Sequence, residues 1–251
     1  MGSDGSATTH FGFSEIPLPD KVHKVREVFD SVAENYDLMN DLMSMGVHRV
    51  WKRYTVHKMR LRPGDRALDM AGGTGDLTRL MSDVVGEKGR VTLCDINESM
   101  VLKGRDVLTD KGLLSKVDWT IGNAEQIPLA DNQYHVAVIG FGIRNVTDID
   151  AALREMVRVL RPGGQFVCLE FSRVAIPFLR PFYDMYSFKV LPEIGARVAN
   201  DRDSYQYLVE SIRRFPTQDE FKEKLEAAGL SQVTYYNVSA GIAAVHIGYK
   251  V

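Results

Sequence analysis

The sequence predicts an α/β fold, an open and doubly wound sheet of about seven strands with helices on both faces. Between residues 66 and 171, five apolar runs alternate with helical segments, as parallel strands with crossover helices require. A glycine cluster directly follows the first run. Residues 232–251 read as a hairpin around Ser239–Gly241, which would add a reversed strand at the C-terminal edge of the sheet.

The five runs are bounded by turn residues and have the lengths typical of buried strands. In chain order they are RALDM (66–70), RVTLCD (90–95), VDWTIG (117–122), YHVAVIGFG (134–142) and QFVCLEF (165–171). Helices are expected after the first run, near 98–110, and over the segment that ends at Pro162 and Gly163.

The chain of 251 residues is long enough for one such domain, 1–251, with additions at its ends. Residues 1–60 are expected to form an N-terminal helical lid, because Val25, Val28, Val32 and Tyr36 recur at helical intervals after a polar segment over 1–20. Residues 61–172 form the ligand-binding core.

The alternation of strands and helices breaks after residue 172. Residues 173–215 are expected to form an inserted helical segment, in which Pro177, Pro181 and Pro192 would interrupt any long helix. Residues 216–251 supply a helix and the hairpin. Thr217 and Glu220 have the spacing of a capping box at the start of that helix.

Composition excludes several classes of function. The formal net charge of −2 shows no basic excess for nucleic acid, so no nucleic-acid partner is expected. Neither Cys nor His pairs have metal-site spacing, and Cys94 and Cys168 read as buried core residues. The N-terminus lacks the features of a secretory signal, and no uncharged apolar run approaches a bilayer span, so the protein is expected to be cytoplasmic.

The glycine cluster indicates a ligand with a ribose. Gly72, Gly73 and Gly75 follow the first strand, where a missing Cβ lets a ligand approach the backbone. Asp95 ends the second strand, and a carboxylate at that place can accept hydrogen bonds from both ribose hydroxyls.

The spacing around these glycines narrows the ligand. The sequence A-G-G-T-G is not the G-x-G-x-x-G of dinucleotide sites, and no Gly-Lys-Ser/Thr follows as in a P-loop. Asp76 would oppose a pyrophosphate at the start of the next helix. The remaining common ligand is the cationic nucleoside S-adenosylmethionine, which Asp69 and Asp76 would tolerate.

Several strings along the chain resemble the ordered motifs of class I, Rossmann-like methyltransferases. More narrowly, they resemble the ubiquinone/menaquinone C-methyltransferase family of the UbiE type, over nearly all of residues 8–251. The strings are LDMAGGTGD, LCDINESMV, GNAEQIP, FGIRNVTD, RVLRPGGQFVCLEFS, TTHFGF, VFDSVAENYDLMNDLMSMGVHRVWKR, VANDRDSYQYLVESI and AAVHIGYKV.

The resemblance implies S-adenosylmethionine as cofactor and a set of residues that bind it. By position in the motifs, Thr74 with Gly72, Gly73 and Gly75 contacts the methionine part, Asp95 holds the ribose, and Asn123 with Ala124 frames the adenine. Ile96, next to Asp95, is a further cofactor-binding residue. Gly140 stands where relatives often have serine and keeps only a backbone contact. Asp69 either binds cofactor or caps the loop amides. Ala71 replaces a glycine, at little cost if its φ is negative.

The resemblance also implies the reaction, which is methylation of a ring carbon of a polyprenylated quinol. The acceptor would be demethylmenaquinol, a 2-methoxy-6-polyprenyl-1,4-benzoquinol, or both. Arg144 and Asn145 follow the fourth strand and are the expected catalytic residues. Arg144 would stabilise a phenolate or hold a hydroxide-like water, and Asn145 would orient the ring hydroxyl. Asp201, Tyr205 and His246 are weaker candidates for a general base.

Two other functions remain open, an O-methyltransferase acting on a small phenol and a non-catalytic cofactor-binding scaffold in a quinone-synthesis complex. Residues 173–202 mix cations with Phe178, Phe182, Tyr183, Tyr186 and Phe188. They form either an irregular cover of the core or an apolar tunnel for a prenyl tail, with cations toward lipid headgroups on the inner face of the cell membrane. A homodimer or a quinone-synthesis complex is a further expectation.

Overall fold

The computed structural model describes residues 8–32, 40–42, 44, 46–198 and 201–251. The strands in these residues are β1 (Thr8–Phe11), β2 (Ser14–Pro17), β3 (Arg66–Met70), β4 (Arg90–Asp95), β5 (Val117–Ile121), β6 (Tyr134–Gly140), β7 (Leu160–Phe171), β8 (Leu230–Val238) and β9 (Ala243–Lys250). The α-helices are α1 (Leu18–Val32), α3 (His48–Lys58), α4 (Asp76–Val85), α5 (Glu98–Asp110), α6 (Ile149–Val159), α7 (Arg180–Met185), α8 (Leu191–Val198), α9 (Arg202–Arg214) and α10 (Gln218–Ala227).

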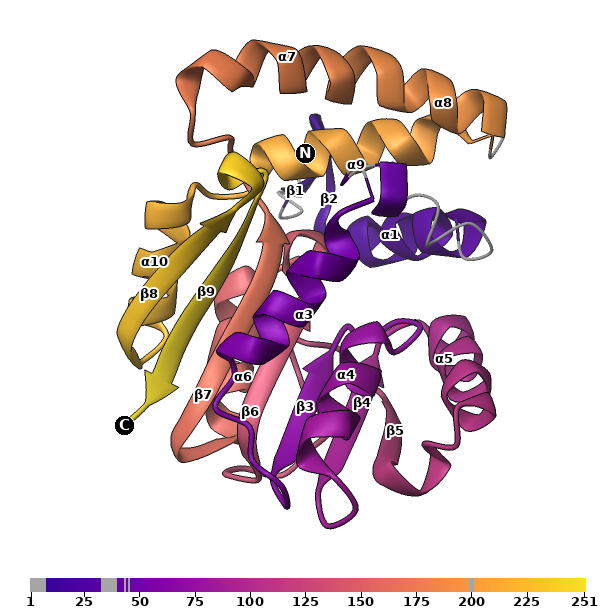
Figure 1. Ribbon diagram of the computed structural model, residues 1–251. Helices are drawn as coiled ribbons and strands as arrows, with labels where there is room; N and C mark the ends of the chain where they lie inside the picture. Colours follow the sequence, from indigo (N-terminus) through magenta and orange to yellow (C-terminus); the bar gives the residue numbers. More distant parts are fainter. Residues whose placement is uncertain (1–7, 33–39, 43, 45, 199–200) are drawn as a thin grey trace, which may run out of the picture.

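The seven-stranded sheet has the order β5-β4-β3-β6-β7-β9-β8 (Figure 1). The strands from β5 to β7 are parallel to one another, whereas β9 runs antiparallel to both β7 and β8. The predicted open sheet with one reversed strand is therefore confirmed, and the C-terminal hairpin carries that strand. β9 lies one place in from the edge, and β8 forms the edge itself.

The strand order places a switch point between β3 and β6. From β3 the chain moves outward to β4 and β5, and it then returns to the other side of β3 to form β6. The crossovers after β3 and β6 therefore cover opposite faces of the sheet, and their loops separate at the carboxyl ends of these two strands. In open α/β sheets, ligands bind in the crevice that this separation leaves.

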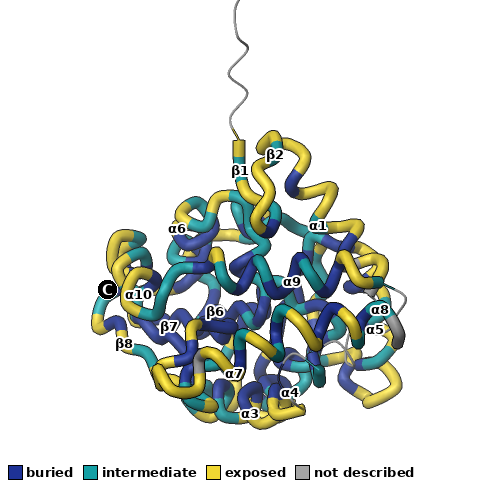
Figure 2. Tube along the Cα trace, turned by 90° about the horizontal axis from the view of Figure 1, so that it is seen from above, coloured by how far each residue is buried: buried dark blue, intermediate teal, exposed yellow. Residues whose placement is uncertain are grey.

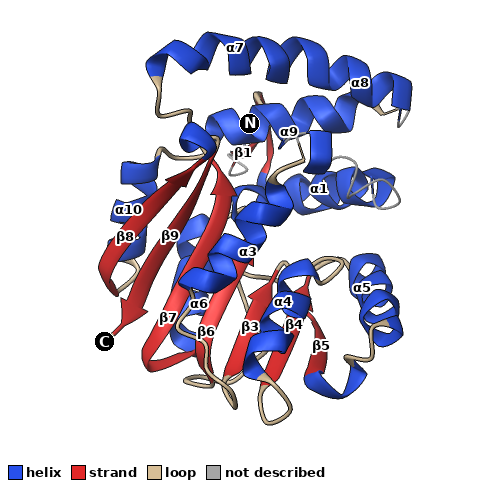
Figure 3. Cartoon of the chain, in the orientation of Figure 1, coloured by secondary structure: helices blue, strands red, loops and turns tan. Residues whose placement is uncertain are grey.

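Helices cover both faces of the sheet (Figure 3). Along β3, Ala67 packs with α3 and α4 in one buried cluster, and Leu68 packs with α6 and α10 in another. This alternation follows from the two-residue period of a strand, and it explains why the central strands are continuous apolar runs. Cys94 and Cys168 lie in this core as free, buried thiols.

The N-terminal segment differs from the sequence-based expectation. Residues 8–17 form the β1–β2 hairpin, which projects from the rim of the molecule in Figure 2, and α1 begins directly after it. Phe11 stacks on Tyr207 of α9 with ring centroids 4.1 Å apart, a contact far along the chain that local polarity could not reveal. In α1, Val28 is buried in the core. Tyr36 and the side chain of Val32 lie outside the described residues.

The expectation that prolines would interrupt any long helix after residue 172 is wrong. α7, a π-helical segment over Tyr186–Val190, and α8 follow one another without a break. Pro181 stands in the first turn of α7, where its missing N–H costs nothing. Just before Pro192, the Leu191 N–H donates to the Tyr186 carbonyl five residues back, the wider π pattern that absorbs local irregularities of a helix.

The capping box at the start of α10 is confirmed and can be tested. Thr217 accepts a hydrogen bond from the Glu220 N–H, and the Glu220 carboxylate accepts one from the Thr217 N–H. We expect T217A to lower the free energy of unfolding by about 1 kcal/mol, because it leaves an orphan N–H at the helix start. Urea denaturation measures this loss. Glu223→Ala, an exposed change on the same helix, is the control, and equal losses in the two variants would contradict the prediction.

Candidate functional site

A cavity opens at the switch point, beyond the carboxyl ends of β3, β4, β5 and β6. It encloses about 850 Å³, its open mouth included, which is the size of a small-molecule site. Its lining comes from the loops after β3, β4, β5 and β6 and from α1. The lining residues are Met70–Ala71, Gly73, Asp95–Asn97, Met100, Asn123–Glu125, Phe141–Gly142, Asn145–Thr147 and, from α1, Val22, Val25 and Arg26.

Asp95 joins two loops of this cavity. One carboxylate oxygen accepts a hydrogen bond of 2.9 Å from the Gly73 N–H, and the other accepts one of 2.9 Å from the Asn97 N–H. Burial raises the pKa of Asp95, and the hydrogen bonds from Asn97 and Gly73 oppose that rise. Each oxygen keeps acceptor capacity on the cavity side, as the two hydroxyls of a ribose require.

The glycines of the loop after β3 have different tasks. Gly73 lines the cavity with φ of +54°, and a Cβ there would lie 3.3 Å from the Met100 side chain. At Gly72 and Gly75 a Cβ would lie 2.7 Å from Leu93 and 2.6 Å from Leu108, so these two glycines permit close packing of the loop. Neither they nor Thr74 line the cavity.

Ala71 adopts a left-handed backbone conformation, with φ of +54°. Alanine would replace glycine here at little cost only if φ were negative. Because φ is positive, the replacement is not free of cost. An L-residue in this region is strained, and glycine is not. Ala71 lies against Gly142, where a Cβ would approach the Ala71 Cβ to 2.6 Å.

The two other acids of the loop do not line the cavity. Asp69 is fully buried and accepts a hydrogen bond of 2.6 Å from the Thr78 hydroxyl, and burial raises its pKa to about 7. Asp76 pairs with Lys52 at 2.6 Å. Burial alone would raise the pKa of Asp76, but the Lys52 ammonium outweighs burial and lowers it. The charge of Asp76 is therefore balanced by Lys52, not directed at a ligand.

One side of the cavity is apolar. Ile96, Met100 and Ala124 line it. The Asn123 side chain also lines the cavity, and its amide oxygen accepts a hydrogen bond of 3.0 Å from the Glu125 N–H, which holds the turn after β5. Gly140 lies under Leu77, which a Cβ would approach to 2.6 Å, and it does not line the cavity.

Arg144 and Asn145 point to different places. The Arg144 guanidinium lies 2.6 Å from the Glu170 carboxylate, both side chains being 2% exposed, and it donates to the Phe141 carbonyl at 2.8 Å. The Arg144 side chain does not reach the cavity, whereas Asn145 lines it. The Asn145 amide oxygen accepts a hydrogen bond of 3.0 Å from the Tyr207 hydroxyl, and its buried amide nitrogen has no partner in the described residues.

The weaker base candidates lie elsewhere. Asp201 caps α9 through the Ser204 N–H, and Tyr205 is buried in the core beside α8. His246 lies in β9 beside the Phe221 ring, and burial lowers its pKa to about 4. None of these side chains lines the cavity.

The sequence predicted a lid but not its contacts with the site. The Arg26 guanidinium donates to the Ile96 carbonyl at 3.3 Å, and Asp30 accepts from the Asn97 amide at 2.8 Å. These two bonds hold α1 over the loop that follows β4. The helical spacing of Val22 and Val25 is the one signal of this arrangement in the sequence.

Comparison with known proteins decides the family. The family model for the ubiE/COQ5 methyltransferase family matches residues 19–250. The chain belongs to this family. Among curated relatives, it is 54% identical to the Ubiquinone/menaquinone biosynthesis C-methyltransferase UbiE of Legionella pneumophila (strain Paris) over 97% of both chains. It is 53% identical to the protein of the same name from Hydrogenovibrio crunogenus, over 99% of this chain and 98% of that one.

Solved structures show the same fold at low sequence identity. A SAM-dependent methyltransferase from Aquifex aeolicus has a TM-score of 0.61 and 20% identity, covering 80% of this chain and 89% of that one. A methyltransferase from Thermotoga maritima described as a possible histamine N-methyltransferase has a TM-score of 0.64 and 19% identity, covering 90% and 100%. The cyclase SpnF has a TM-score of 0.63 at 17% identity, so the fold alone does not determine the reaction.

As a member of the ubiE/COQ5 family, the chain is an S-adenosylmethionine-dependent methyltransferase. The cavity fits that cofactor. Asp95 offers acceptors for the ribose diol, Ile96 and Ala124 offer apolar contacts for the adenine, and Gly73 leaves room at the backbone. Among the residues that the structure describes, Asp95 and Glu125 are the acidic ones that line the cavity.

Asp95 provides a test of this assignment. In D95N, one oxygen becomes an amide N–H₂, which cannot accept from a backbone N–H or a ribose hydroxyl. We expect the Kd for S-adenosylmethionine to rise by about 100-fold, as the loss of a charged acceptor implies. Isothermal titration calorimetry measures it. Asp118→Asn on β5, an exposed carboxylate, should bind normally. A D95N affinity within about threefold of wild type would contradict the assignment.

Proposed function

We propose that this methyltransferase transfers the methyl group of S-adenosylmethionine to a ring carbon of a polyprenylated quinol. The acceptors are demethylmenaquinol, a 2-methoxy-6-polyprenyl-1,4-benzoquinol, or both. The observation that carries the proposal is the identity of 54% to a relative named Ubiquinone/menaquinone biosynthesis C-methyltransferase, over 97% of each chain. The apolar cavity supports it, because an aromatic ring needs such a wall.

The bound cofactor supplies a methyl group on a positively charged sulfur, which is a good electrophile without further activation. The chain's own task is to hold the two reactants in line and to exclude water. The acceptor must be the reduced ring, because an oxidised quinone is electron-poor. α1, held by Arg26 and Asp30, covers part of the cavity.

Asn145 is the residue that we assign to the acceptor. Asn145 lines the cavity, and its buried amide nitrogen has no partner in the described chain, so it has hydrogen bonds left to donate to a ring hydroxyl. A phenol titrates near 10, and a donor at the hydroxyl next to the reacting carbon stabilises the phenolate that makes this carbon nucleophilic. The Tyr207 hydroxyl donates to the Asn145 oxygen and so sets the orientation of the amide.

Arg144 fixes the position of the loop that carries Asn145. Its guanidinium holds the Phe141 carbonyl and the Glu170 carboxylate, which in turn accepts from the Phe171 N–H. These bonds attach the turn Ile143–Asn145 to the end of β7. A buried ion pair of this kind costs several kcal/mol when one partner is removed, so Arg144 fixes where Asn145 stands.

The reaction and the role of Asn145 are tested together. The anaerobic assay uses a reduced naphthoquinol or methoxy-benzoquinol with a short prenyl tail, and mass spectrometry locates the new methyl group. We expect ring-carbon methylation that leaves both hydroxyls titratable. In N145A, kcat should fall by about 100-fold, because a donor to the developing oxyanion is lost.

The control for this assay is Asn237→Ala, a change on the exposed face of β8. It should leave kcat unchanged, and both variants should bind S-adenosylmethionine normally. Methylation on oxygen, or no turnover with either quinol, would overturn the proposed reaction. Normal turnover in N145A would overturn only the role of Asn145.

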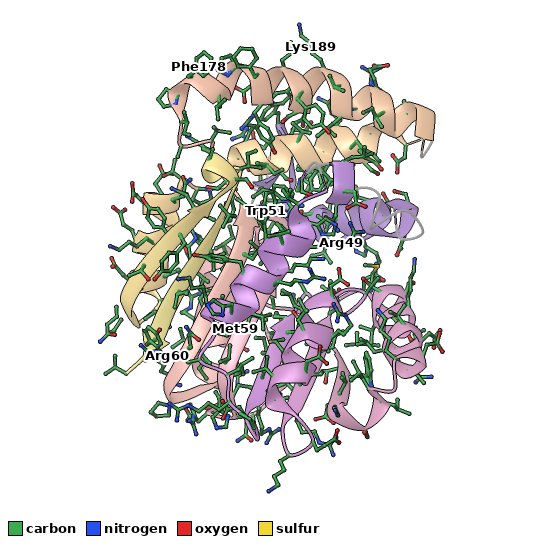
Figure 4. The ribbon with its side chains drawn as sticks, in the orientation of Figure 1. Arg49, Trp51, Met59, Arg60, Phe178 and Lys189 are labelled. Carbon is green, nitrogen blue, oxygen red and sulfur yellow. The ribbon has the colours of Figure 1, made fainter. Side chains whose placement is uncertain are left out.

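We also propose that α7 rests on a membrane surface. Phe178, Phe182 and Met185 are 74%, 56% and 54% exposed, and their spacing places them on one side of the helical segment together with Lys189. Figure 4 shows Phe178 and Lys189 on the outer side of this segment, pointing away from the body of the molecule. None of the helices in the described parts of the chain has the length and apolar content to cross a bilayer.

Exposed aromatics beside a lysine suit the boundary between headgroups and acyl chains. We expect the double variant F178E/F182E to lose binding to vesicles that contain anionic phospholipid, measured by co-sedimentation. It should keep its turnover on a short-tailed, water-soluble quinol. Leu114→Glu is the control, since this residue is 54% exposed on another surface. Equal sedimentation of the double variant and wild type would contradict the membrane contact.

A further inference from the structure

A second cavity lies behind the cofactor cavity, between the β1–β2 hairpin, the start of α1 and the end of α9. It encloses about 690 Å³, its open mouth included. Val146 and Thr147 line both cavities and form the wall between them. The second cavity differs in charge, because Lys21, Arg144, Arg214 and His10 line it together with hydroxyl groups, and none of its lining residues is Asp or Glu.

Lys21 is a buried cation without a counter-ion in the described chain. Lys21 is 8% exposed, and its ammonium group donates a hydrogen bond of 3.0 Å to the Val146 carbonyl. No carboxylate among the described residues lies within ion-pair distance of it. Burial lowers the pKa of Lys21, and Glu125 opposes this from a distance. The ammonium keeps two N–H groups that the carbonyl does not use.

Other buried donors in this wall are also unpaired. The Arg144 Nε–H is buried and has no partner in the described residues, although the other side of the guanidinium holds Glu170. The Thr147 hydroxyl is buried and without a partner as well. Native proteins rarely leave such groups unsatisfied, and each one therefore indicates a missing acceptor.

The mouth of the cavity adds a further cation. Arg214 ends α9, is exposed, and makes no ion pair with any described residue. Its guanidinium lies 3.5 Å from the His10 ring nitrogen, so the two groups border the same opening. Two carboxylates next to the wall are already used, since Glu170 accepts from Arg144 and Glu125 accepts from the Thr147 N–H at 3.0 Å.

We propose that this second cavity binds a small oxyanion, a phosphate or carboxylate group, through Lys21, Arg214 and the unpaired donors of the wall. An oxyanion accepts hydrogen bonds and donates none, which matches a lining with surplus donors and no acid. A buried ammonium is stable when a counter-ion and further hydrogen bonds satisfy it, and the anion supplies both. The site does not depend on the proposed quinol reaction, because it lies outside the cofactor cavity.

Binding of inorganic phosphate and of acetate to the full chain tests the proposal. Isothermal titration calorimetry is run at constant ionic strength, with chloride as the balancing anion and with S-adenosylmethionine affinity as the check on folding. We expect wild type to bind at least one of the two anions, and K21M and R214Q to weaken that binding by about tenfold or more, as the loss of a charged hydrogen bond implies. The anion that binds more tightly identifies the class of ligand.

Two further variants make the result specific. Lys21→Arg keeps a charged hydrogen-bond donor for an oxyanion and should keep the binding. Arg105→Gln removes an exposed cation of α5 that lines neither cavity, and it should bind the anion as wild type does. No binding of either anion by wild type would overturn the proposal. Equal binding by wild type, K21M and R214Q would also overturn it, because the anion would then lie elsewhere.

Discussion

The Asp95 carboxylate is the interaction on which the cofactor cavity depends. Each of its oxygens accepts one backbone N–H, from Gly73 on one side and from Asn97 on the other. A single buried carboxylate therefore sets the distance between the loop after β3 and the start of α5. Because Asn97 also donates to Asp30 of α1, the same contact extends to the helix that covers the cavity.

A buried ion pair has the matching role on the other side of the cavity. Arg144 and Glu170 join the turn after β6 to the end of β7, and Tyr207 of α9 then orients the neighbouring Asn145. Phe11 of the β1–β2 hairpin stacks on the Tyr207 ring. This side of the cavity is thus assembled from three parts of the chain that lie far apart in the sequence.

The sequence predicted the sheet well because its signals are local. RALDM and RVTLCD coincide with β3 and β4, and Thr217 caps α10 as its spacing indicated. Misses occurred where a distant contact decides the structure. The hairpin over residues 8–17 depends on its contact with α9. The negative charge of Asp76 favours a cationic ligand when the sequence is read alone, but Lys52 of α3 balances this charge.

The sequence by itself determined the α/β fold, the place of the ligand crevice and the family motifs, since each depends on residues close together in the chain. The tertiary structure alone decided which predicted residues reach the cavity: Gly73, Asp95, Ile96, Asn123, Ala124 and Asn145 line it, and Arg144, Asp69 and Gly140 do not. The direction of a side chain depends on the partners that burial brings to it. For Arg144 that partner is Glu170, 26 residues away on the next strand.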